Sequence, residues 1–143
     1  MAIYSLSLRT TVTTIAAASW AALSPATNEA AIMELGYING AATANVVGWG
    51  RTANTPTLTS GVAFLAEDEG RPTGLTQAAV AFGTAPTVPA QFFRRFSMAA
   101  LVGAGIVFTF PRGLVLPAGG PAVCAWNITA NSAVVDIHAV ADE

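Results

Sequence analysis

The sequence predicts an all-β protein that folds as a single antiparallel β-sandwich over residues 1–143. Short apolar or alternating runs follow one another along the chain, and its 13 glycines and 8 prolines lie mostly between them. These turn signals recur roughly every 8 to 12 residues, which is typical of sandwiches and barrels. No strand–helix–strand rhythm and no internal repeat is visible. Among sandwiches we expect a jelly roll of about eight strands in two sheets.

The first elements follow from local patterns. Residues 2–9, AIYSLSLR, alternate apolar side chains with serines, the pattern of a half-buried strand. Residues 10–23 mix alanines, which favour helix, with threonines, which favour strand, so we expect an extended segment with at most one helical turn. Strict alternation across residues 31–38 predicts two faces, with Met33, Leu35 and Tyr37 on one and Ile32, Glu34 and Ile38 on the other.

The rest of the chain continues in the same way. Residues 54–61, NTPTLTSG, predict a turn-rich loop, and residues 67–74, EDEGRPTG, form the most polar loop. Further strands are expected in residues 44–51, 62–66, 75–83, 90–101, 105–110, 113–120, 121–128 and 133–141.

Charged side chains are scarce. They make up 10% of the chain, against about 25% in typical domains. All six basic residues are arginines, so lysine, the usual guard of exposed strand edges, is missing. Residues 113–141 contain one formally charged residue, Asp136. The net charge of −2 provides no basic field for nucleic acid, which we exclude as a partner.

Two apolar stretches resemble membrane or export signals. Residues 96–110 lie between arginines, but they are shorter than the ~20 residues of a spanning helix. We predict two strands joined by a turn near Gly103 and Gly105 instead. Residues 6–26 faintly resemble a signal peptide, but threonines interrupt the apolar region. We therefore expect neither a membrane partner nor a cleaved leader.

The residues that could carry catalysis or bind a metal are few. A metal-binding cupin needs several histidines, and His138 is the only one. Asp136 and His138 share a strand face and could pair as orienter and base, but no nucleophile accompanies them. Cys124 lies in an apolar run, which predicts a small buried residue. We expect no enzyme activity, no cofactor and no metal.

Three short motifs are interpreted as incidental. Residues 48–53, GWGRTA, fit a dinucleotide fingerprint, but no helix can follow them to hold a pyrophosphate. Residues 67–69, EDE, could attract a cation, although a solvated loop tip fits them better because no alternating ligand spacing is present. Residues 127–129, NIT, form a glycosylation sequon that has meaning only in a secreted eukaryotic protein.

Residues 92–97, FFRRFS, contain two consecutive arginines within a predicted strand. Arg94 and Arg95 must point to opposite faces, so at least one lies beside apolar surface. Its guanidinium then needs a carboxylate or carbonyl group. That group could belong to this chain, for example to Glu34, or to a neighbouring copy or partner, and the sequence leaves both open.

Three segments carry a resemblance to a known group. They are MELGYINGAATANVVGWGR, PTVPAQFFRRFSMAALVGAGIVFTFPRGLVLPAGG and VVDIHAVADE, which are spread along the chain from Met33 to Glu143. They resemble small virion proteins of tailed bacteriophages, of the capsid decoration or cement class. The resemblance implies a non-enzymatic β-sandwich, commonly a homotrimer, that binds the major capsid protein on the shell after assembly in the host cytoplasm.

Self-association would also explain the scarcity of charge, because obligate interfaces are more hydrophobic than ordinary surfaces. On this view residues 113–141 supply core and subunit packing, while polar loops such as residues 67–72 face outward or meet the shell. The interface candidates are Arg94, Arg95, Arg112, Trp126, Asp136 and His138. Two alternatives stay open: a tail or neck protein, and a carbohydrate-binding module in which Trp20, Trp49 and Trp126 stack on sugars.

Overall fold

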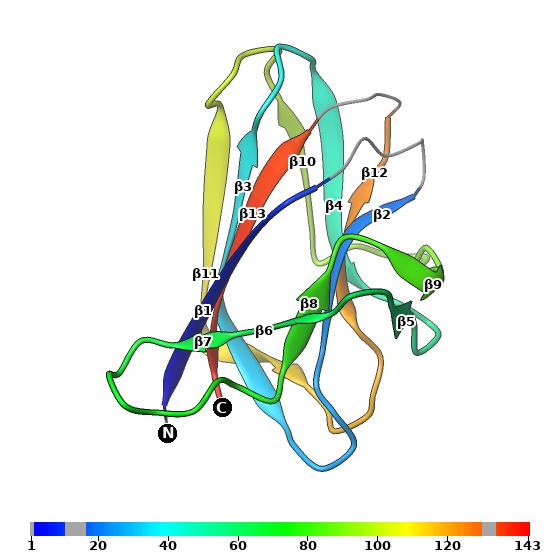
Figure 1. Cartoon of the computed structure of the whole chain (residues 1–143). Coiled ribbons are helices and arrows are strands. Elements are labelled where there is room, and N and C mark those ends of the chain that lie inside the picture. The colour runs from blue at the N-terminus through cyan, green and yellow to red at the C-terminus, as the bar shows by residue number, and fades with distance from the viewer. Residues whose placement is uncertain (1, 11–16, 130–133) are drawn as a thin grey trace.

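The computed structural model describes residues 2–10, 17–129 and 134–143, which form strands and no helix (Figure 1). Sheet A contains, in order, β11 (Gly105–Leu116), β3 (Ala30–Asn39), β13 (Val135–Asp142), β1 (Ile3–Arg9) and β7 (Leu65–Ala66). Sheet B contains β10 (Arg94–Met98), β4 (Asn45–Arg51), β12 (Val123–Asn127), β2 (Ala18–Leu23), β8 (Gln77–Ala79) and β6 (Val62–Ala63). A short ribbon pairs β5 (Thr57–Leu58) with β9 (Phe82–Thr84). All pairings are antiparallel, and the two large sheets confirm the predicted β-sandwich.

The chain alternates between the two sheets. β1, β3, β11 and β13 belong to sheet A, whereas β2, β4, β10 and β12 belong to sheet B, so most successive long strands cross the core. Among these long strands the alternation breaks once, at the long connection between β4 and β10, which are neighbours in sheet B. Both described chain ends lie at the same end of the sandwich (Figure 1).

Aromatic rings fill the space between the sheets. Trp20 and Trp49 of sheet B meet edge to face with centroids 5.7 Å apart, and Trp49 contacts Tyr37 of sheet A at 6.4 Å. Tyr37 continues to Phe96, and Phe96 to Phe108, at 5.7 and 5.4 Å. Such ring pairs are worth about 0.5 to 1.5 kcal/mol beyond the area they bury. The rings therefore join the two sheets from the centre to the β10–β11 side.

A bulge in β3 overturns the predicted faces of Ile32 and Met33, whereas Leu35 and Tyr37 lie in the core and Glu34 and Ile38 outside it, as predicted. In the pairing with β13, Glu34 faces Val140 and Ile32 faces Ala141, so Met33 is an extra residue. The extra residue shifts the alternation by one position. Ile32 consequently points into the core together with Leu35, and Met33 does not share their face.

Three other segments differ from their predicted extents. Residues 75–83 divide into β8 of sheet B and β9 of the short ribbon. Residues 62–66 do not form one strand, because the chain passes from sheet B to sheet A at the buried Phe64 and divides into β6 and β7. Residues 105–110 and 113–116 form one strand, β11, with an irregular pairing between Thr109 and Leu114. Gly113 adopts a φ of 67°, which lets the bulge form without ending the strand.

The apolar stretch of residues 96–110 forms strands, as predicted. It contributes most of β10, a turn that includes Gly103, and the first half of β11. Within residues 10–23, Ala18–Leu23 form the extended strand β2, Thr10 follows the end of β1, and residues 11–16 lie outside the described residues.

Within the described residues no helix has the length and apolarity needed to cross a membrane.

The charge-poor segment, residues 113–141, supplies the two central strands. β12 lies between β4 and β2, and all five of its residues are buried. β13 lies between β3 and β1 and buries every second residue in the core. Neighbouring strands of the same chain therefore cover most of this segment. Its predicted role in the core is confirmed, and its role in subunit packing stays a prediction.

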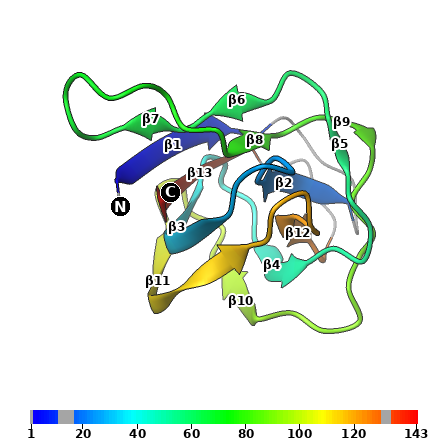
Figure 2. The ribbon, with the colours of Figure 1, turned by 90° about the horizontal axis from the view of Figure 1, so that it is seen from below.

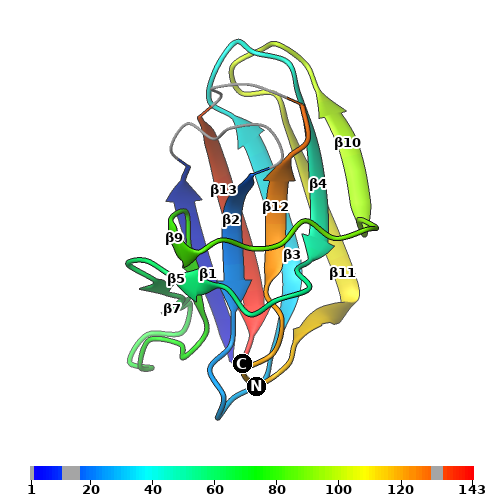
Figure 3. The ribbon, with the colours of Figure 1, turned by 90° about the vertical axis from the view of Figure 1, so that its right-hand side faces the viewer.

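The outer face of sheet B is covered by the long connection between β4 and β10. Figure 3 shows residues 85–93 crossing in front of this sheet. Phe92 packs on Trp126, with ring centroids 5.9 Å apart. The glycines of the GWGR stretch make room for this cover, since a Cβ on Gly48 would lie 2.5 Å from the Phe92 ring and one on Gly50 2.9 Å from Pro89. We call residues 85–93 the strap. It explains these glycines without a dinucleotide site.

Candidate interaction surface

The outer face of sheet A has no such cover among the described residues. Successive strand pairings arrange its side chains in four rows that run across the sheet. From the β3–β4 end toward the chain ends, the rows are Gly105–Ile38–Asp136–Arg9, Val107–Gly36–His138–Ser7, Thr109–Glu34–Val140–Ser5–Leu65 and Val115–Ala31–Asp142–Ile3.

Apolar side chains are spread over this face. Ile3, Ile38, Leu65, Val107 and Val115 belong to the exposed large hydrophobic residues of the chain, with exposures of 38% to 60%. At about 4.8 Å between strands and about 3.4 Å per residue, the four rows span roughly 20 Å in each direction. The face therefore offers a projected area of about 400 Å², half of the about 800 Å² that each partner buries in a standard interface.

His138 lies near the centre of this face. A Cβ on Gly36 would lie 1.8 Å from its Cε1 atom, so the imidazole occupies the space that the missing side chain leaves. Its Nε2 atom is 3.0 Å from Oε1 of Glu34 on the neighbouring strand. Both side chains are about one-third exposed, at 31% and 34%. Glu34 thus pairs with His138 and not with an arginine, the pairing considered from the sequence.

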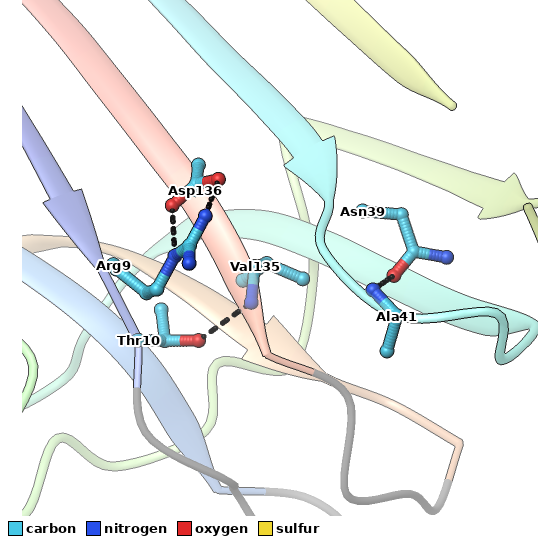
Figure 4. A network of polar contacts seen from close by, with 6 residues as sticks. All are labelled: Arg9, Thr10, Asn39, Ala41, Val135 and Asp136. Carbon is cyan, nitrogen blue, oxygen red and sulfur yellow. Dashed lines mark hydrogen bonds and ion pairs between the residues drawn. The ribbon is translucent and has the colours of Figure 1, made fainter. Parts of the chain in front are cut away.

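Asp136 forms a two-pronged ion pair with Arg9 (Figure 4). Nε and Nη2 of Arg9 donate to the two carboxylate oxygens at 2.7 and 2.8 Å. These hydrogen bonds hold the pKa of Asp136 below its ordinary value and raise the pKa of Arg9. Asp136 and His138 share a face as predicted, but each has a different partner and they do not form an orienter–base pair.

The end of the face near Asp136 is held by backbone contacts. The hydroxyl of Thr10 accepts from the amide of Val135, and the Thr10 amide donates to the Val135 carbonyl at 2.8 Å (Figure 4). The buried Asn39 accepts from the amide of Ala41, and its own amide group donates to the carbonyls of Thr43 and Ala99. Asn39 thereby ties the β3–β4 turn to the β10–β11 turn.

A shallow hollow of about 460 Å³ lies beside His138. Its floor is low because Ser5 and Ser7 are small, while Leu65 and Val140 contribute to its walls. It holds one imidazole and two hydroxyl groups but no nucleophile activated by a base.

The other predicted interface residues are distributed over two regions. Arg94 and Arg95 lie on β10 and Arg112 on β11, and all three are exposed. Arg94 donates from Nη1 to the carbonyl of Phe93 at 2.8 Å. Trp126 is fully buried beneath the strap, so it is a core residue and not an exposed interface residue. Strand periodicity did not reveal the strap that covers it.

Arg51, which the sequence did not single out, has a structural role. It is half-buried, its Nη2 donates to the carbonyl of Val115 in sheet A at 2.7 Å, and its guanidinium carbon lies 5.7 Å from the centre of the Phe93 ring. Burial lowers its pKa. This arginine links β4 of sheet B to β11 of sheet A, on the side of the sandwich where β10 and β11 are the edge strands.

The tryptophans considered for sugar stacking are all in the core. Trp20, Trp49 and Trp126 are at most 1% exposed, so none offers a ring face to a ligand. Asn127 of the sequon is also buried. Cys124 is buried, as predicted, and burial raises the pKa of its thiol. The described residues contain no cluster of three or more histidine, cysteine or acidic side chains that could hold a metal ion.

Comparisons with protein-family models, with curated proteins and with solved structures find no match to this chain.

Proposed function

We propose that this chain is a non-enzymatic structural protein of a bacteriophage virion that joins copies of itself and reinforces the assembled capsid shell. The sequence resemblance to decoration proteins supports the class. The observation that carries the proposal is the difference between the two outer faces: the strap covers sheet B, whereas sheet A exposes five large apolar side chains among the described residues. Exposed apolar surface of this kind marks interaction sites.

The open face of sheet A is the surface that meets the shell in this proposal. Its projected area of about 400 Å² gives a weak contact when a single copy binds. Attachment therefore depends on several copies acting together, since multivalency raises overall avidity by about a hundredfold or more. A symmetric oligomer, with a trimer as the expected form, supplies those copies.

Strand order supports the finer assignment of a jelly roll. Eight described strands have five or more residues. Their orders are β1-β13-β3-β11 in sheet A and β2-β12-β4-β10 in sheet B, so the first and last strands pair in one sheet and the second and second-to-last in the other. Strands that are distant in sequence pair in this way in a double Greek key.

The proposal is tested by sedimenting the purified protein with shells of the encoding phage assembled without it. We expect saturable binding and an increase in the temperature at which the shells disassemble. The variant Ile38→Lys should lose binding because it places a charge in the open face. Val88→Lys, in the strap and similarly exposed at 43% against 38%, is the matched control. Binding to isolated tails alone would favour the tail or neck alternative, and unchanged binding of Ile38→Lys would refute the docking face.

A further inference from the structure

The carboxylates of this chain gather in one region. Glu67, Asp68 and Glu69 lie in the loop that follows β7, and Glu29, Asp142 and Glu143 line one shallow hollow. The two groups are adjacent, because the Glu67 amide donates to the carbonyl of Ile3 and the Glu143 amide to that of Ala2. The Glu143 carboxylate also accepts from the amides that follow the loop. We call these six residues the acidic corner.

One arginine accompanies the acidic corner. Arg71 pairs with Asp68, with Nε and Oδ2 3.3 Å apart. The other two carboxylates of the chain, Glu34 and Asp136, are paired with His138 and Arg9 on the open face. The acidic corner thus has a large excess of negative charge.

The remaining exposed arginines lie elsewhere. Arg94 and Arg95 on β10, together with Arg112 on β11, form what we call the arginine edge. β10 and β11 are the edge strands of their sheets on the same side, joined by the contact of Phe96 with Phe108. None of the three guanidinium groups has a carboxylate partner within the described ranges.

The arginine edge and residues 67–69 of the acidic corner lie on opposite sides of the sandwich. Sheet A runs β11-β3-β13-β1-β7, so four strand spacings, about 19 Å, separate β11 from β7. Figure 2 shows the β7 loop and β10 at opposite edges of the molecule. One copy therefore cannot bring its arginine edge to its own residues 67–69, but two copies can bring these regions together. Glu29 and Asp142, at the ends of β3 and β13, lie nearer to β11.

We propose that the arginine edge of one copy binds the acidic corner of the next copy, so that the chains join head to tail. The proposal rests on the self-association in the proposed function and names the surfaces that perform it. Guanidinium groups bind carboxylates through two parallel hydrogen bonds, which gives both strength and orientation. Half-buried rings beside the arginine edge, such as Phe93 and Phe110, add apolar area.

Head-to-tail contact has a consequence for symmetry. Two different patches meet in each contact, and such heterologous contacts close into rings when the rotation between copies allows it. A ring of three copies satisfies every arginine edge and every acidic corner. A neighbouring copy would then cover the edge strands β10 and β11. This cover would prevent unwanted strand pairing, which exposed lysines prevent in other proteins.

Charge reversal in the full chain tests the pairing. The edge variant carries Arg94→Glu and Arg95→Glu, the corner variant carries Glu67→Arg and Glu69→Arg, and the combined variant carries all four changes. We expect each partial variant to associate at least about a hundredfold more weakly than the wild type, as measured by light scattering over a dilution series. The combined variant should regain the wild-type mass, because its surfaces are complementary again.

The control variant carries Ala53→Glu and Ala81→Glu, two exposed positions outside both regions, and should keep the wild-type mass. Thermal unfolding confirms that every variant is folded. An oligomer whose mass is unchanged in both partial variants would overturn the edge-to-corner pairing and leave self-association intact. A wild-type monomer at all concentrations would overturn self-association itself. An edge variant that keeps its mass but loses binding to shells would assign the arginine edge to another protein and refute our proposal.

Discussion

Removal of the Phe92 ring should uncover the outer face of sheet B. The ring lies over Gly48 and packs on Trp126 at 5.9 Å. A half-buried phenylalanine removes roughly 80 Å² of apolar area from water, worth about 2 kcal/mol, and the ring pair adds about 0.5 to 1 kcal/mol. We expect Phe92→Ala to lower the free energy of unfolding by about 2.5 to 3 kcal/mol and the Tm by about 8 to 10 °C.

The assay for this variant combines unfolding by denaturant with tryptophan emission in the native state. All three tryptophans are buried in the wild type, so exposure of Trp126 should shift the emission to longer wavelength. Val88→Ala is the control, because it lies in the same strap with a side chain 43% exposed, and should change stability by less than about 0.5 kcal/mol. Equal stability of the two variants, with no emission shift, would show that the strap does not cover the face.

Three further predictions concern single sites. The lowered pKa of Asp136 contributes stability above its unfolded value of about 3.9, which is lost as the pH falls through the lower folded value. Asp136→Asn should therefore remove part of the acid-induced loss that unfolding curves between pH 2 and about 5 record, and an unchanged profile would contradict the pairing with Arg9. Cys124 should resist a thiol reagent in the native protein and react fully in denaturant, whereas rapid native reaction would refute its burial. Gly113→Ala should destabilise the protein by about 1 to 3 kcal/mol, and more than Gly70→Ala does. Both glycines have positive φ, but only a Cβ on Gly113 would be crowded, at 2.7 Å from the Cβ of Ala31. Equal losses of stability in thermal unfolding would argue against this crowding.

Local sequence patterns predicted the strands because burial on one face produces alternation. Residues 2–9 illustrate this, since Tyr4 and Leu6 point into the core whereas Ser5 and Ser7 do not. The pattern failed in β3, where Ile32 and Leu35 both point inward. A bulge depends on pairing with a distant strand, so alternation along one segment cannot predict it.

Local sequence patterns could not predict that the strap covers the outer face of sheet B, because the strap belongs to a long connection between strands. Trp126 was predicted to be an interface candidate because it lies in an apolar run, but Phe92 and Pro89 cover it from the strap. The glycines at positions 48 and 50 were a signal of close approach that the sequence alone did not explain. Similarly, the acidic corner could not be predicted from sequence, because Glu29, Glu67 and Glu143 come together only through the sheet pairings.

The fold explains the scarcity of charged residues and their distribution. Residues 113–141 contain little charge because they supply β12 and β13, each of which has a neighbouring strand on both edges. Most of the charged side chains gather in the acidic corner and the arginine edge. We infer that the remaining exposed apolar surface and these charged regions are covered by other molecules.

The solution mass of the wild-type protein, measured by light scattering after size exclusion, tests this account most directly. The measurement covers a dilution series down to low micromolar concentration, at low and at high salt. We predict an oligomer with the mass of three chains that persists on dilution at low salt and dissociates more readily at high salt, because salt screens contacts between charges. A monomer of 14.5 kDa at every concentration and salt would contradict the account.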